Sequence, residues 1–375
     1  MKKIILSLLA LTLALSAACT PQKSTFSEKE STAPTAEATT EAATEEAAAS
    51  PLAAAKAALD ALAADYEFEG VACITQNGAV AYLYTGGKDR NGADFTLQTP
   101  LPVGSVSKQF CAAAVMKLCE EGKLQTSDTL DRFFPDYKEG KRLTVHNLLS
   151  MRSGIPDIIN KPLLAGASET NTYAQNREAV LQSIFAQTLE FEPDKAYQYS
   201  NSNFMLLSAV VEQLSGKTYA DYLHEQFFTP LGMENTGSLD ELQGSAPVWA
   251  SGLAYPYAAG VATGAGDVIS SAADMDKWMT ALSGGTAVSA ESYRLMTTDY
   301  ATDTEDHYGY GLSVYGDGSV GHAGAIIIEE TPYCSYDIIG SENSYHLFLG
   351  GSDCTQPDIE GIRSDIVDIL KQYLK

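Results

Sequence analysis

Ser105 and Lys108, three residues apart, are the residues in this sequence whose types and spacing point most directly to chemistry. If a helix begins near Ser105, positions i and i+3 share one face, which brings the hydroxyl and the amine within hydrogen-bond reach. A serine hydroxyl needs a base beside it to act as a nucleophile, and burial can turn lysine into that base by disfavouring its ammonium form. No other serine in the chain has a lysine three residues later. The alternative interpretation is a helix-capping serine followed by a solvated lysine.

Tyr199 and Asn201 form a second candidate group. They stand just before an apolar run, 204–207, which predicts a helix capped by Asn201 or Ser202. A phenol near a lysine can move a proton, and an amide side chain can bind a substrate amide. Taken alone, the pair also fits a core tyrosine followed by a capping asparagine.

A third group comprises His322, Ala323 and Gly324, which precede the apolar stretch 325–328. Glycine at the start of a strand allows another backbone or a ligand to approach closely. The triplet at 307–309 has the same pattern, but His307 lies in a polar run typical of a loop. We therefore favour His322, although either histidine alone could be structural.

These three groups, in this order, resemble the S-x-x-K, Y-x-N and H-x-G motifs of the penicillin-recognising serine hydrolases. The tyrosine in the second motif points to the branch that contains class C β-lactamases, D-aminopeptidases, related esterases and D-Ala-D-Ala carboxypeptidases. The likeness covers residues 55–350. It extends to segments outside the motifs, namely 143–149 with 153–157, 191–193, 230–233 and 269–275.

The resemblance implies a role for each catalytic position. Ser105 becomes acylated, and Lys108 and Tyr199 share the role of general base, with the order of proton transfer left open. The backbone N–H groups of Ser105 and Ala325 form the oxyanion hole.

The resemblance also implies the substrate-binding residues, which are Asn201, His322, Ala323 and Gly324. Asn201 orients the substrate amide, and His322 stands where β-lactamases have a lysine. A histidine is largely neutral near pH 7, and Ala323 lacks the usual hydroxyl, so both departures weaken binding of a substrate carboxylate.

The elements that must position these residues alternate in type along the chain. Strand-like runs at 70–76 and 80–85 flank Asn77–Gly78, the strongest short hairpin signal. A helical region of about 105–231 follows, then strands at 310–315, 325–330 and 345–350. Apolar residues at helical spacing predict terminal helices from Pro51 and over 358–374.

We expect the α/β class and, from the resemblance, a β-lactamase/transpeptidase-like fold: an antiparallel sheet flanked by N- and C-terminal helices, with an inserted helical lobe. The domain spans 51–375, with a sheet lobe of about 51–100 and 255–375 and a helical lobe of about 101–254.

The first 50 residues predict export and anchoring. A basic start and a short apolar run make residues 1–18 a signal peptide. The small residues before Cys19 resemble the lipobox of bacterial lipoproteins, in which the cysteine carries the lipid. Residues 19–50, rich in Ala, Glu, Thr and Ser, predict a disordered tether. We expect an extracytoplasmic protein anchored to the bacterial membrane by lipid alone, or else a secreted one.

The charge argues against a nucleic-acid-binding protein, and the cysteine content argues against a fully disulfide-bonded one. The formal net charge is −24, and such an acidic surface repels nucleic acid and anionic lipid headgroups. Excluding Cys19, five cysteines remain, so they cannot all pair within the chain. No Cys/His spacing suggests a metal, and we expect no cofactor.

Together these features predict a serine hydrolase acting through an acyl-enzyme on an amide or ester, with a cell-wall D-peptide or an ester favoured over a β-lactam. The partner is then a small-molecule or peptide substrate, including peptidoglycan fragments, and the oligomeric state stays open. One alternative is a β-lactamase, and another is a non-catalytic, penicillin-binding-like receptor lipoprotein. A solute-binding lipoprotein would need repeated βα units, which the sequence does not show.

Overall fold

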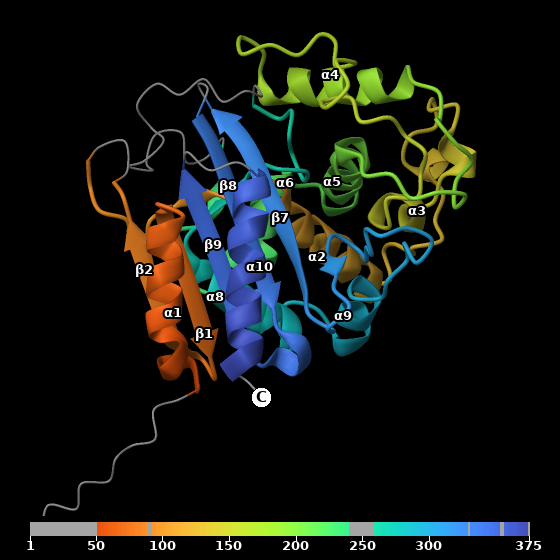
Figure 1. Ribbon diagram of the computed structural model, residues 1–375. Helices are drawn as coiled ribbons and strands as arrows, with labels where there is room; N and C mark the ends of the chain where they lie inside the picture. Colours follow the sequence, from red (N-terminus) through yellow and green to blue (C-terminus); the bar gives the residue numbers. More distant parts are fainter. Residues whose placement is uncertain (1–50, 89–91, 240–258, 329–330, 353–355, 374–375) are drawn as a thin grey trace, which may run out of the picture. The chain divides into compact units, whose positions relative to one another are not determined.

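A six-stranded antiparallel sheet runs through the part of the chain that the computed structural model describes, residues 51–373 without 89–91, 240–258, 329–330 and 353–355 (Figure 1). Its strand order is β2-β1-β9-β8-β7-β6. The sheet therefore joins the two ends of the described chain, as expected from the sequence. The strands are β1 Glu69–Gln76, β2 Ala79–Gly86, β6 Ser313–Val314, β7 Val320–Ile328, β8 Thr331–Ile339 and β9 His346–Ser352.

The first hairpin forms as predicted, because Asn77 and Gly78 both have positive φ (53° and 73°), as a tight turn between twisted strands requires. Two predictions about the later strands are wrong. The strand expected at 310–315 is reduced to the two residues of β6, and β8 was not expected at all. Ser335 and Asp337 place polar side chains in the middle of β8, which hides its strand character from a hydrophobic pattern.

Helices cover both faces of the sheet. On one face, α1 (Pro51–Asp65) and α10 (Gln356–Tyr373) pack against each other, in the foreground of Figure 1. Leu59 of α1 and Ile362 of α10 belong to the hydrophobic cluster on this face. A larger cluster fills the other face, beneath α2 (Ser107–Glu120) and α8 (Ala272–Ser283). The expected antiparallel sheet with flanking terminal helices and an inserted helical region is confirmed.

The inserted region consists mainly of helices, with a three-stranded sheet of order β3-β5-β4 beside it. The helices are α3 Val145–Leu149, α4 Tyr173–Phe185, α5 Asn201–Ser215, α6 Tyr219–Leu223 and α9 Ala290–Met296, and the strands are β3 Leu101–Pro102, β4 Gly237–Ser238 and β5 Val268–Ser270. Short helical turns complete it: η1 Gly104–Val106, η2 Leu130–Arg132, η3 Gly140–Arg142 and η4 His224–Phe228. A further turn, η5 Ser341–Asn343, connects β8 to β9.

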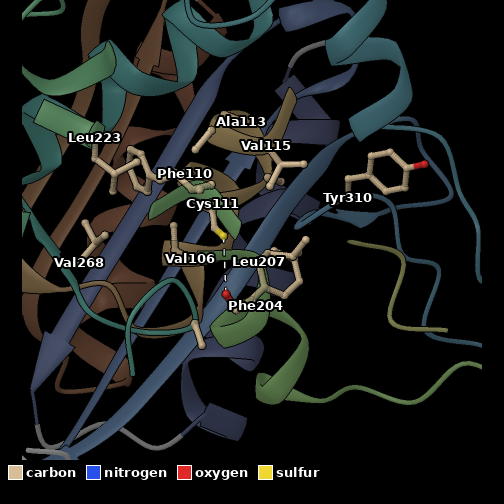
Figure 2. Packing of buried hydrophobic residues seen from close by; sticks show 14 of the residues in the cluster. Val106, Phe110, Cys111, Ala113, Val115, Phe204, Leu207, Leu223, Val268 and Tyr310 are labelled. Carbon is tan, nitrogen blue, oxygen red and sulfur yellow. Dashed lines mark hydrogen bonds between the residues drawn. The ribbon is translucent and has the colours of Figure 1, made fainter. Parts of the chain in front are cut away.

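Helix α2 is buried over most of its surface, and this determines how firmly its first turn is held. Phe110 packs edge-on against Phe228 and lies 4.1 Å, centroid to centroid, from Trp278. Cys111 points into the contact with α5, where its thiol lies 3.8 Å from the carbonyl oxygen of Phe204 (Figure 2). A helix that is buried over most of its surface cannot shift without opening the core, so its N-terminal turn is held rigidly in place.

Several predictions concern residues outside the described part. The signal peptide (1–18), Cys19 and the tether (19–50) lie there, as does Cys354, and the domain boundaries stay predictions. Among the described cysteines, Cys73, Cys111 and Cys119 are free thiols. None of the described helices is both long and apolar enough to cross a bilayer.

Candidate active site

Ser105 and Lys108 meet as their spacing predicts. Ser105 lies in the turn η1, and Lys108 lies in the first turn of α2. The Lys108 amine donates hydrogen bonds to Ser105 Oγ (2.9 Å), to Asn201 Oδ1 (2.8 Å) and to the carbonyl oxygen of Ala265 (2.7 Å). Three acceptors match the three N–H bonds of an ammonium group, so the amine is fixed in direction.

Burial changes the acid–base character of Lys108. The residue has no exposed surface, and this burial lowers its pKa to about 7, while the carboxylates of Asp157 and Asp267 act in the opposite direction. A substantial fraction of Lys108 is therefore neutral near pH 7 and can accept a proton from Ser105.

Tyr199 lies against the same amine. Its ring centroid is 4.9 Å from Lys108 Nζ, and its ring also contacts those of Tyr308 and His322. Burial raises the pKa of the Tyr199 phenol well above its usual value, and the side chain of Ser105 opposes that change. The phenol therefore keeps its proton in the resting site.

Asn201 is the first residue of α5, whose N-cap is Ser200, so both predicted caps, Asn201 and Ser202, are one or two residues too late. Asn201 instead bridges Lys108 to Asp157, because its Nδ2 donates to Asp157 Oδ2 (2.8 Å) and its backbone N–H donates to the same oxygen (3.1 Å). Asp157 is 5% exposed and was not predicted as a site residue. Its one signal was its place in the segment 153–157 that resembles the family.

Two glycines bring the turn η1 against strand β7. A Cβ atom on Gly104, whose φ is +49°, would lie 2.9 Å from the backbone nitrogen of Ala325. A Cβ atom on Gly324 would lie 2.0 Å from the carbonyl oxygen of Val103. Since neither position has room for a side chain, residues 103–104, just before Ser105, lie directly against residues 324–325 of β7, and an oxyanion hole formed by Ser105 and Ala325 needs such a close approach.

His322 lies inside β7 rather than before a strand, which corrects the expected start at residue 325. Its Nε2 is 3.1 Å from Tyr308 Oη and its Nδ1 is 2.6 Å from the carbonyl oxygen of Ala323, so Nδ1 donates and Nε2 accepts. Burial and the charge of Lys108 lower the pKa of His322 to about 3. The imidazole is therefore neutral, with both nitrogens bonded within the protein. Tyr308, a neighbour of the rejected His307, was missed.

The predicted site residues Ser105, Tyr199, Asn201, His322, Ala323 and Ala325 line one cavity of about 770 Å³. His307 does not line it; that side chain is exposed and pairs with Asp299 (2.7 Å). Arg363 of α10 also lines the cavity, between the rings of Tyr315 and Tyr336, at 4.9 and 5.2 Å from their centroids. Hydrophobic patterning gave no signal for Arg363.

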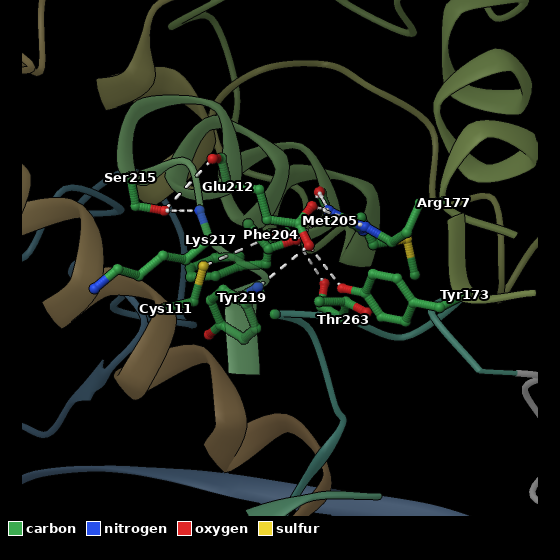
Figure 3. Close-up of polar contacts among 12 residues, drawn as sticks. Cys111, Tyr173, Arg177, Phe204, Met205, Glu212, Ser215, Lys217, Tyr219 and Thr263 are labelled. Carbon is green, nitrogen blue, oxygen red and sulfur yellow. Dashed lines mark hydrogen bonds and ion pairs between the residues drawn. The ribbon is translucent and has the colours of Figure 1, made fainter. Parts of the chain in front are cut away.

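A polar network that includes Arg177, Glu212 and Thr263 (Figure 3) holds the chain two residues before Ala265. Ser208 donates to the carbonyl oxygen of Thr263 (2.9 Å) and accepts from Arg177 (2.9 Å), which in turn pairs with Glu212 (3.0 Å). Helices α4 and α5 thus fix the loop against which Lys108 is aligned.

Among the residues that the structure describes, no group of three or more His, Cys, Asp or Glu side chains could hold a metal ion. What the cavity offers instead is a hydroxyl beside a partly neutral amine, a protonated phenol and the closely approaching backbones of Gly104 and Ala325. This set can attack a carbonyl carbon and stabilise the oxyanion that forms.

Comparison with known proteins agrees with the geometry. The family model described as Beta-lactamase matches residues 55–335. The protein named as penicillin-binding protein PbpX of Bacillus subtilis is 31% identical over 261 residues, 66% of this chain and 62% of that protein. The D-aminopeptidase of Brucella anthropi is 28% identical over 272 residues, 68% of this chain and 51% of that protein. This chain thus spans less than two thirds of either relative.

Solved structures show the same fold. The D-amino acid amidase of Ochrobactrum anthropi SV3, complexed with L-phenylalanine amide, superposes with a TM-score of 0.71 at 22% identity, over 87% of this chain and all of the other. The penicillin-binding protein of Bacillus halodurans gives 0.68 at 20% identity, over 82% and 98% of the two chains. The match of the family model over most of the chain, on a shared fold, shows that this chain belongs to the beta-lactamase family.

Proposed function

We propose that this protein is a serine hydrolase that cleaves an amide or ester through an acyl-enzyme on Ser105. The observation that carries the proposal is the fully buried Lys108 amine, 2.9 Å from Ser105 Oγ. A lysine that served only packing or solubility would keep its amine in water, since burying an unpaired ammonium group is costly. Here the amine is aimed at a serine that faces a cavity.

In the proposed reaction, Ser105 Oγ attacks the substrate carbonyl carbon while its proton moves to Lys108 Nζ. The carbonyl oxygen becomes an oxyanion that accepts hydrogen bonds from the N–H groups of Ser105 and Ala325. When the intermediate collapses, the bond to the amine or alcohol breaks, and this leaving group takes a proton relayed from Lys108 through Tyr199. Water then hydrolyses the ester, releasing the acid and restoring the serine.

The two candidate bases, Lys108 and Tyr199, differ in how easily they accept a proton at neutral pH. Burial moves the pKa of Lys108 down to about 7, whereas burial moves that of Tyr199 further up. At neutral pH the group that can accept a proton is therefore Lys108, and Tyr199 enters with its proton in place. This supports Lys108 as the base for acylation and Tyr199 as the proton donor to the leaving group.

Labelling with a fluorophosphonate probe tests the proposal. The wild-type protein should form a Ser105–phosphorus bond with loss of fluoride, and Ser105→Ala should not label. Ser200→Ala is the matched control, because the Ser200 hydroxyl is buried near the cavity and bonds to none of the described residues. A wild-type protein that stays unlabelled would instead favour the non-catalytic receptor.

For the substrate we propose a cell-wall D-peptide or an ester. The neutral His322 provides no cation for a substrate carboxylate, and the D-aminopeptidase named above is one of the relatives. A panel of D-amino-acid amides, p-nitrophenyl esters and a fluorescent penicillin, read by turnover and intact mass, would rank these classes.

A β-lactamase is the second candidate, and Arg363 favours it. Arg363 lines the cavity, and its Nε is buried with no hydrogen-bond partner among the described residues. A carboxylate entering here would find the cation that His322 does not supply. Hydrolysis of the penicillin, rather than slow acylation alone, would support this candidate.

We also propose that the protein is exported and lipid-anchored through Cys19. The support is the sequence pattern of residues 1–19. Radiolabelled palmitate should enter the wild-type protein and not Cys19→Ala. Equal labelling of the two would exclude Cys19 as the attachment site.

A further inference from the structure

Two polar side chains of β8, Ser335 and Asp337, lie in the interface between the sheet and helix α2, and neither has exposed surface. Ser335 Oγ donates a hydrogen bond of 2.8 Å to the carbonyl oxygen of Val103, just before the turn η1. Asp337 accepts from Gln109 Nε2 through both carboxylate oxygens, at 2.7 and 2.8 Å. Ser335 therefore binds the residue before the turn that carries Ser105, and Asp337 binds the first turn of α2, which follows it.

Gln109 follows Lys108 directly, and its amide is fully used. While its Nε2 donates to Asp337, its Oε1 accepts from Trp278 Nε1 of α8 at 3.0 Å. Asp337 Oδ1 also accepts from the backbone N–H of His322 at 2.9 Å. One buried carboxylate thus connects the helix that bears the nucleophile and base to the strand that bears the oxyanion-hole amide.

A buried, ionisable hydrogen-bond network costs stability compared with apolar packing of the same volume. Asp337 illustrates this, because burial raises its pKa to about 7 against the effect of its hydrogen bonds. Such networks fix one arrangement of the elements that they join. Neither Ser335 nor Asp337 lines the cavity, so direct contact with a substrate does not explain them.

The contact between β7 and the chain just before Ser105 is already as close as sterics allow. The backbone of residues 103–104 lies directly against β7. A Cβ atom added to Gly324 would be only 2.0 Å from the carbonyl oxygen of Val103, so no larger residue fits there. Steric contact sets how near the two backbones can come, while the Ser335 and Asp337 hydrogen bonds keep them from moving apart. The gap between the Ser105 and Ala325 amides is thereby fixed from both directions.

We propose that Asp337, Gln109 and Ser335 are positioning residues for acylation: they hold η1 and α2 against β7 so that the Ser105 and Ala325 amides converge on one oxyanion. The proposal rests on the proposed serine-hydrolase function. It predicts that disturbing these residues lowers the rate of the chemical step more than it weakens binding, because the oxyanion exists only in the transition state.

The test is saturation labelling with a fluorophosphonate probe, which separates the maximal rate of inactivation from the half-saturating concentration. In Asp337→Asn the new amide keeps one oxygen to accept from the His322 N–H, but it turns its NH2 group toward the donor Gln109 Nε2, so the two-oxygen contact with Gln109 is lost. We expect the maximal rate to fall by tenfold or more, with the half-saturating concentration changed less than twofold. Adding Gln109→Glu supplies acceptors for both the new amide and Trp278 Nε1. The double variant should recover to within about threefold of the wild type.

Thr75→Val is the matched control, because Thr75 is a buried polar residue of the same sheet that bonds to Asp276 of α8, away from the cavity. It should lower the thermal midpoint without changing the maximal rate. If Asp337→Asn does not fold, Ser335→Ala takes its place, with an expected loss of about threefold to tenfold in maximal rate.

Two results would overturn the proposal: an Asp337→Asn or Ser335→Ala variant that loses thermal stability but keeps the wild-type maximal rate, or a double variant that regains stability without regaining rate. A wild-type protein that does not label at all would refute the proposed function instead.

Discussion

Replacing Asp157 by Asn should move the acidic limb of the pH–rate profile, where the labelling rate falls as pH decreases, to lower pH. The carboxylate of Asp157 reaches Lys108 through Asn201, by two hydrogen bonds of 2.8 Å on either side of one amide group. The width of an amide then puts the two charges within about 8 Å. Removing the anion disfavours the ammonium form of Lys108, so the pKa of Lys108 falls.

Coulomb's law gives the size of the effect. At an effective dielectric constant of about 20, two charges about 8 Å apart interact by about 2 kcal/mol, equivalent to a pKa change of about 1.5. The pKa of Lys108, about 7 in the wild type, should therefore fall to about 5.5. At pH 6 the variant would then label about eightfold faster than the wild type, when each rate is expressed relative to its own high-pH plateau.

The assay is the second-order rate constant of fluorophosphonate labelling between pH 5 and pH 9. Asp337 also titrates near neutral pH, because burial raises its pKa to about 7, but its contribution is common to both proteins. Asp157 also accepts from the N–H groups of Ile159 and Asn160, so the plateau rate and thermal midpoint of the variant report any structural damage separately.

Asp267→Asn is the graded control for this prediction. Asp267 raises the pKa of Lys108 less than Asp157 does, so its variant should shift the limb in the same direction by a smaller amount. A limb that stays in place in Asp157→Asn, or moves to higher pH, would refute Lys108 as the group whose deprotonation starts the reaction.

Three further predictions concern other parts of the site. Lys108→Ala and Tyr199→Phe should each lower labelling by several orders of magnitude and together do little more, since groups that act as one unit are non-additive; additive losses would separate their roles. Gly104→Ala should lower stability by about 1–3 kcal/mol and slow labelling, because its Cβ would lie 2.9 Å from the Ala325 nitrogen at a strained φ; wild-type values in thermal melts and labelling would count against the oxyanion-hole geometry. Arg363→Gln should raise KM for penicillins about tenfold and leave uncharged p-nitrophenyl esters unchanged; equal changes for both would remove Arg363 from carboxylate recognition.

Local signals in the sequence predicted the parts of this protein that depend on neighbouring residues. The turn at Asn77–Gly78 requires only two residues with positive φ, and the approach of Lys108 to Ser105 requires only helical spacing. What the sequence did not reveal depends on distant partners. Asp157 matters because Asn201, 44 residues later, donates to it, and Tyr308 because its hydroxyl faces His322.

Strand β8 was missed for the same reason. Its buried polar residues, Ser335 and Asp337, look like surface residues until their partners in the helical region, Val103 and Gln109, are known. Patterns of hydrophobicity assume that polar side chains face water. They fail where a polar side chain is buried with a partner more than 200 residues away in the chain.

The pairing of β1 with β9 has a consequence for how the chain folds. Val71 of β1 lies opposite Gly350 of β9, so the central sheet closes only when segments from opposite ends of the described chain have met. Closing so long a loop makes folding slow, and β1 keeps an unpaired edge until β9 forms hydrogen bonds with it. A chain ending at residue 345 would keep every residue named in the reaction, yet it would leave that hairpin with no strand to join it to β8.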